Sequence, residues 1–116
     1  MIADEGVSDI IANYIQSNYT KIKVGSGGDA PSEADTELDS FVAEKTVTPS
    51  LIGTIMTWTV EFTGAEIGLE GISELGIFKS GNPPSGDKML SRVTFSNTGV
   101  LASADTLTIT IRVEVG

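Results

Sequence analysis

The sequence contains no cysteine and no histidine among its 116 residues. Without cysteine, the chain has neither a disulfide nor a thiolate-bound metal ion. Without histidine, it lacks the commonest general base and the commonest ligand for transition metals. Catalysis by a Ser-His-Asp or Cys-His arrangement is therefore excluded. We expect a protein that is not an enzyme, with no catalytic residue, no metal site and no cofactor.

Basic residues are also scarce. Lys and Arg together number 7 against 16 Asp and Glu, which gives a formal net charge of −9 at pH 7. Binding to a phosphate backbone or to anionic lipid needs a basic face. The acidic start, MIADEGVSD, is unlike a signal peptide, and no apolar run approaches the ~20 residues that span a bilayer. We therefore expect neither a nucleic-acid nor a membrane partner.

The chain has the length of one domain. Its beginning predicts an amphipathic helix, because large apolar residues recur there at helical spacing. Asp4 is a suitable N-cap, and the helix is expected to stop near Asn18. We place this helix in residues 1–19 and a β domain in residues 20–116. The members of the apolar stripe are Val7, Ile10, Ile11, Tyr14 and Ile15.

From Tyr19 onward the apolar period is two, as in strands with one apolar and one wet face. Alternation is strong over 56–63 and 106–115 and weaker elsewhere, where further strands are predicted over 21–24, 41–48, 72–79 and 88–96. A loop with adjacent prolines, 81–87, separates the last two. About six strands without intervening helices favour an all-β fold, an antiparallel, jelly-roll-like β-sandwich, after one N-terminal α-helix. In its core, Trp58, Val60 and Phe62 are expected to pack against Leu107, Ile109 and Ile111.

A glycine-rich segment, Gly25-Ser26-Gly27-Gly28-Asp29-Ala30, satisfies the dinucleotide-binding fingerprint, and an acid, Glu44, follows at a suitable distance. A nucleotide site needs a helix directly after the glycines. Here Pro31 follows, and SEADTEL offers no apolar stripe. We therefore interpret Gly25, Gly27 and Gly28 as residues with positive φ where a strand leaves the sheet.

Several carboxylates also raise the question of a site. Asp29, Glu33, Asp35 and Asp39 are oxygen ligands of the kind that Ca²⁺ takes, but their spacing does not match a D-x-D-x-D-G loop, and a solvated acidic loop is favoured. Glu61, Glu66, Glu70 and Glu74 are the nearest candidates for a glycosidase pair, and acids on turns and strand faces are favoured instead.

Arg92 lies in the predicted strand MLSRVTF and has two interpretations. An exposed side chain whose stem covers apolar neighbours is favoured. The alternative is a fixed ion pair with Glu74 or Glu61.

Three segments, in this order, resemble small structural proteins of tailed viruses. The first is IKVGSGGDAPSEADTELDSFVAEK, a strand, a glycine-rich turn and a small-polar run. The second, GISELGIFKSGNPPSGDKMLSRVTF, is similar to that family's pairing of E-x-G-[LI]-F with M-L-[SA]-R-x-x-F across a polar loop. The third, ADTLTITIRVEV, is similar to its closing D-x-L-x-[IV]-x-[IVW] strand. Together they cover most of residues 21–115.

The resemblance implies a β-sandwich virion component of tailed bacteriophages or archaeal tailed viruses, assembled in the host cytoplasm. We expect a non-enzymatic structural protein at the capsid surface, as a decoration or turret-like minor capsid protein. A tail or baseplate-fibre component is the alternative. A carbohydrate-binding β-sandwich module is the rival from another class, and the scarcity of aromatic residues counts against it.

The partners expected from this resemblance are other virion proteins and further copies of the chain, in a homo-oligomer that is a trimer or higher. The helix stripe is the candidate partner contact, through Val7, Ile10, Ile11, Tyr14 and Ile15. It either closes its own domain or contacts another subunit, because anchors at this spacing are a common docking device.

Overall fold

The computed structural model describes residues 4–67, 71–81 and 86–115. Its elements in chain order are α1 (Asp4–Asn18), β1 (Lys21–Gly25), β2 (Phe41–Thr46), β3 (Ser50–Ile52), β4 (Ile55–Thr63), α2 (Gly64–Ile67), β5 (Glu74–Lys79), β6 (Lys88–Thr94) and β7 (Thr106–Glu114). No described helix is long and apolar enough to cross a membrane. The chain is mostly β with a helix at its beginning, as the change of period near Tyr19 predicts.

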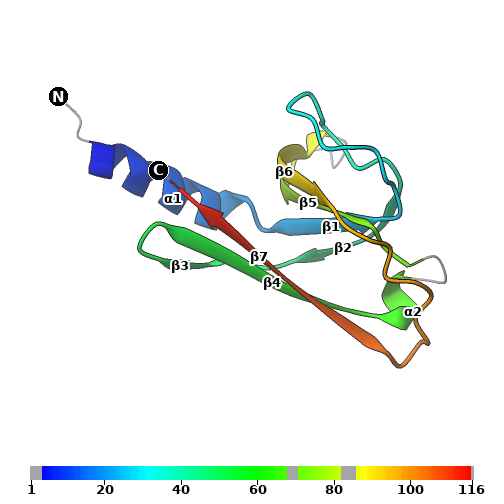
Figure 1. Cartoon of the computed structure of the whole chain (residues 1–116). Coiled ribbons are helices and arrows are strands. Elements are labelled where there is room, and N and C mark those ends of the chain that lie inside the picture. Colours follow the sequence, from blue (N-terminus) through cyan, green and yellow to red (C-terminus); the bar gives the residue numbers. More distant parts are fainter. Residues whose placement is uncertain (1–3, 68–70, 82–85, 116) are drawn as a thin grey trace.

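The strands form two antiparallel sheets (Figure 1). One has four strands in the order β2-β1-β5-β6, and the other has three in the order β3-β4-β7. The pairing of β4 with β7 keeps one register along its whole length, whereas the β1–β2 and β5–β6 pairs each contain a register shift. Antiparallel sheets of this kind tolerate one wet face, which explains why the alternation is visible in the sequence.

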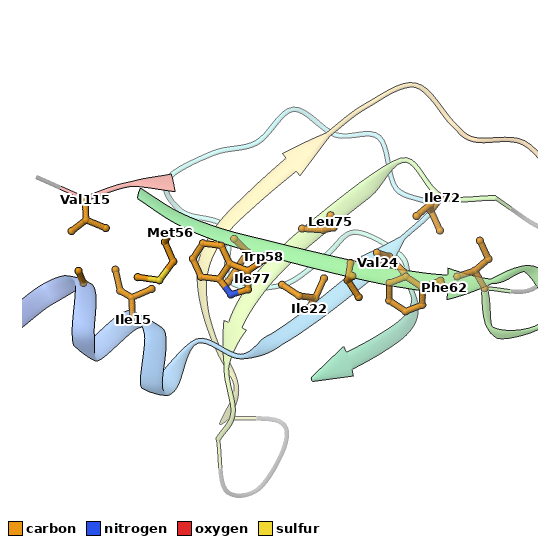
Figure 2. Close-up of a cluster of buried hydrophobic side chains, with 13 residues drawn as sticks. Ile15, Ile22, Val24, Met56, Trp58, Phe62, Ile72, Leu75, Ile77 and Val115 are labelled. Carbon is orange, nitrogen blue, oxygen red and sulfur yellow. The ribbon is translucent and has the colours of Figure 1, made fainter. Parts of the chain in front are cut away.

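One apolar core draws side chains from both sheets and from α1 (Figure 2). The inward residues of β4 are at most 2% exposed, namely Met56, Trp58, Val60 and Phe62. The four-stranded sheet contributes Ile22, Val24, Leu75 and Ile77, each at most 1% exposed. The indole N–H of Trp58 donates to the carbonyl oxygen of Tyr19 at 2.8 Å, so the one tryptophan is buried with its polar atom satisfied.

The expected contacts between the two strongly alternating strands are confirmed. Trp58 pairs with Ile111, Val60 with Ile109 and Phe62 with Leu107. These residues are neighbours within one sheet, and they face the same core. The β4 members are fully buried, while the β7 members are only half-buried.

Two short elements are absent from the sequence-based prediction. Strand β3 has 3 residues and begins at Ser50, shortly after the end of the strand predicted over 41–48. Helix α2 has 4 residues, and its start is a reciprocal capping box. The N–H of Glu66 donates to Thr63 Oγ1 at 3.3 Å, and the N–H of Thr63 donates to Glu66 Oε1 at 2.9 Å. The predicted loop 81–87 is described only at its two ends, since residues 82–85 lie outside the described part.

Candidate functional site

The apolar stripe of α1 is divided between two environments. Ile15 is 8% exposed and lies in the core beside Ala12, which the stripe did not include. The other four members remain exposed: Val7 43%, Ile10 64%, Ile11 45% and Tyr14 48%. Packing of the helix on its own domain therefore buries only Ile15 of the stripe. We call Val7, Ile10, Ile11 and Tyr14 the α1 surface.

The end of α1 that adjoins β1 is fixed to the sheets by specific contacts. Gln16 Nε2 donates to the carbonyl oxygen of Pro49 at 3.2 Å. Lys79 Nζ donates to the Tyr14 hydroxyl oxygen at 2.7 Å and lies 5.3 Å from the centre of that ring. The rings of Tyr14 and Tyr19 meet edge to face at 6.4 Å. These contacts hold the helix at one end of the molecule, with its N-terminal turns pointing away from β1 (Figure 1).

The N-terminal half of α1 is acidic, whereas Lys79 contacts Tyr14 toward the other end of the helix. The first turn carries Asp4 and Glu5, and the last turn carries no basic residue. A groove lined by Ser8, Asp9 and Gly53 separates this half of the helix from the turn between β3 and β4. An apolar surface that is acidic at its N-terminal end fits an apolar partner surface with basic residues facing that end.

The most extensively bonded polar cluster surrounds Arg92. Its Nε donates to Glu74 Oε1 at 3.0 Å, and its other nitrogens lie 3.2 Å from Asp35 Oδ2 and 3.0 Å from Asp39 Oδ2. The Arg92 side chain is 2% exposed. The favoured interpretation of Arg92 as an exposed side chain is therefore wrong, and the alternative, an ion pair with Glu74, is correct. Glu61 is not its partner.

A loop explains why Arg92 is buried, although the alternation of side chains along β6 places it on the face expected to meet solvent. The segment 26–40 crosses this face of the four-stranded sheet (Figure 1). It places Asp35 and Asp39 on the guanidinium. It also brings Leu38 so close to Gly76 that a Cβ there would lie 3.1 Å from Leu38 Cδ2.

Glu74 ties the same loop to β5. Its carboxylate, 0% exposed, accepts the backbone N–H groups of Gly27 at 2.7 Å, Asp39 at 2.9 Å and Ser40 at 2.9 Å. Burial alone would raise the pKa of Glu74, but the N–H groups and the Arg92 guanidinium outweigh it, so this pKa lies below its ordinary value. Glu74 is therefore a charged structural anchor of the loop.

The glycines of the fingerprint segment do not adopt positive φ, so that expectation is wrong; the described glycines that do are Gly53, Gly71 and Gly99. Gly25 and Gly27 instead allow other groups to approach the backbone closely. A Cβ on Gly25 would lie 2.7 Å from Glu74 Oε2, and one on Gly27 would collide with Asp39 and the same carboxylate. Nothing in the structure explains Gly28. Residues 26–40 contain no helix, so the arrangement lacks the phosphate-binding element of a dinucleotide site.

The remaining candidate acids are dispersed. Asp29 and Glu33 are exposed in the loop, while Asp35 and Asp39 are turned to Arg92. Within the described ranges, no group of three or more acidic residues is placed to hold a metal ion. Glu44 lies 3.3 Å from Lys21 and Glu66 lies 2.8 Å from Lys45. Glu61 is exposed on β4, and Glu70 lies outside the described residues.

A second ion cluster holds the start of β6 against β1. The Asp87 side chain is 4% exposed and lies 2.8 Å from Lys21 Nζ and 3.1 Å from Lys23 Nζ. It also accepts the N–H of Gly81 at 2.7 Å. Burial would raise the pKa of Asp87, but the Gly81 N–H and the two ammonium groups lower it, to about 2.

This cluster predicts a specific loss of stability in acid. The pKa of Asp87 is 3.8 in the unfolded reference and about 2 in the folded chain, so its contribution is complete above the first value and disappears as the pH falls through the second. Between about pH 5 and pH 2, the free energy of unfolding of the parent should fall by about 2 kcal/mol more than that of Asp87→Asn. Urea titrations at each pH measure both values. Glu33→Gln, an exposed acid, is the control. Equal declines in parent and Asp87→Asn would contradict the assignment.

Comparison of the sequence with known families and with curated proteins identified no relative. No protein-family model matches the chain, and no curated protein matches its sequence. The functional argument therefore depends on the α1 surface and on the sequence motifs.

Proposed function

We propose that this chain is a non-enzymatic virion structural protein of a tailed virus, acting at the capsid surface as a decoration or turret-like protein. The observation that carries the proposal is the α1 surface, where four large apolar side chains are between 43% and 64% exposed on one helix. A patch of this kind on a small acidic domain is typical of a protein–protein contact. The order of the tailed-virus motifs supports the virion context.

We also propose that the two sheets form a jelly-roll-like β-sandwich. Inward side chains of both sheets belong to one cluster, which supports this arrangement. Helix α1 adds only Ala12 and Ile15 to that cluster. The strands then supply a rigid body, and the helix supplies a contact surface at one end of it.

The proposal includes assembly in the host cytoplasm, other virion proteins as partners, and a homo-oligomer that is a trimer or higher. A tail or baseplate-fibre position would use the same contact surface and is the alternative location. The carbohydrate-binding rival gains no support from Trp58, because a sugar platform needs an exposed ring and this one is 0% exposed.

The proposal predicts that the α1 surface is needed for incorporation into particles. In the full chain, Ile10→Ser combined with Ile11→Ser should reduce the copies per particle by about ten-fold, because central apolar anchors dominate such interfaces. The change should alter the free energy of unfolding by less than about 0.5 kcal/mol, since both side chains are exposed. Quantitative mass spectrometry of purified particles measures the copies.

The matched control is Val100→Ser, which removes an apolar side chain that is 68% exposed and lies between β6 and β7. It should leave the copy number unchanged. Normal incorporation of the double variant would remove the α1 surface from this role. Absence of the parent chain from purified particles would overturn the virion function itself.

A further inference from the structure

The edges of the two sheets differ in their protection against pairing with another strand. Natural edges are blunted by shortness, by irregular register or by charge. Strand β3 has 3 residues. Strand β2 pairs with β1 through a shifted register and carries Glu44 and Lys45 side by side. Strand β6 also has a shifted register and begins with Lys88.

Strand β7 lacks these protections over most of its length. It has 9 residues, contains no Pro or Gly, and pairs with β4 in unbroken register. Its only charged residues, Arg112 and Glu114, are near its C-terminal end. Within the described part of the chain, β4 is its only neighbour in the sheet, so its other edge is free (Figure 1). A long, regular, nearly neutral edge is a template for strand addition.

The inward row of β7 is also incompletely covered. Leu107, Ile109, Ile111 and Val113 are half-buried, although they share the core face with residues of β4. Their β4 partners, Phe62, Val60, Trp58 and Met56, are at most 2% exposed. A further strand beyond β7 would extend this face of the sheet and shield the row from water.

We infer that the free edge of β7 pairs with the same edge in a second copy of this chain, antiparallel and centred on Thr110. In this register Thr110 faces the partner's Thr110, and Ile109 faces the partner's Ile111. Leu107 likewise faces the partner's Val113. Thr–Thr and β-branched apolar pairs are favourable across antiparallel strands. Edge-to-edge pairing joins two three-stranded sheets into one continuous sheet. Because the contact is isologous, it relates two copies, and a larger homo-oligomer needs a second interface as well.

Charge distinguishes between the two orientations of a second copy. Two chains of net charge −9 repel each other, but β7 carries one positive and one negative residue, so this edge adds no repulsion of its own. Antiparallel pairing centred on Thr110 places Arg112 opposite the partner's Thr108 and Glu114 opposite the partner's Thr106. Parallel pairing in register would instead set like charges beside each other, which is unfavourable.

The β7 contact is separate from the α1 surface. Each copy then has two interfaces, one through β7 and one through α1. A result that contradicts one of these interfaces does not contradict the other. The helix variants described above test the proposed function, while substitutions at Thr110 test the edge.

The β7 pairing is tested by introducing charged residues at Thr110, which lies on the two-fold axis of the proposed contact. In the full chain, Thr110→Lys and Thr110→Glu each place like charges opposite each other, and each should weaken self-association by about ten-fold or more. An equimolar mixture of the two variants should restore it, because Lys then faces Glu. Sedimentation velocity over a range of concentrations measures the masses, and circular dichroism verifies that each variant is folded.

Thr59→Lys is the matched control, since Thr59 pairs with Thr110 and is exposed on the same face, one strand in from the edge. It should leave self-association unchanged. A parent chain that stays monomeric would overturn the inference, and so would equal effects of Thr59→Lys and Thr110→Lys. Weakened association that the mixture does not restore would overturn the two-fold register. The pairing of β7 with β7 is supported if each variant by itself associates weakly and the mixture associates as the parent does.

Discussion

Arg92→Met is expected to lower the free energy of unfolding by about 3–5 kcal/mol, because removal of one partner leaves buried charge without compensation. The substitution leaves the Glu74 carboxylate 0% exposed and without its guanidinium partner. Three backbone N–H groups still bind that carboxylate, which places the expected loss toward the lower end of the range. Urea unfolding at neutral pH measures the effect.

Arg112→Met is the matched control, because the other arginine of the chain is exposed on β7. We expect it to change the free energy of unfolding by less than about 0.5 kcal/mol. Hydrogen exchange gives a second measurement. The amides of Gly27, Asp39 and Ser40 should exchange faster in Arg92→Met, since the loop loses the cation that holds Asp35 and Asp39. Unchanged exchange together with unchanged stability would contradict the anchoring role.

The two longest strands, β4 and β7, were predictable because their alternation is clean. In β4 each inward side chain is at most 2% exposed and each intervening one is polar, so the period alone identifies the core face. The helix α1 was predictable from the same kind of signal at the helical period. The short helix α2 carried a usable signal in its Thr63–Glu66 capping box, and four residues are too few for a periodic pattern.

The environment of the polar cluster was not predictable in this way. Alternation places Arg92 on the face opposite Leu75, and it contains no information on whether a distant loop covers that face. The loop 26–40 does so through contacts 53 and 57 residues away in the chain. Gly25 and Gly27 were recognised as special, but their cause is a close approach to Glu74, which no local pattern reveals. For the same reason, the stripe of α1 predicted an apolar face without indicating which of its members the domain would bury.

Phe62→Ala is the second large effect that we expect, a loss of about 3–5 kcal/mol in the free energy of unfolding. The ring is 0% exposed, pairs with Leu107 across the sheet, and lies 5.3 Å from Lys45 Nζ. Its removal would leave a cavity, because the structure around a truncated core residue relaxes only partially. Phe41→Ala is the matched control, because this ring is 55% exposed and its loss should cost less than about 1 kcal/mol. Thermal and urea unfolding of both variants compares the same truncation inside and outside the core. Similar losses for the two phenylalanines would mean that β4 does not face the core as described.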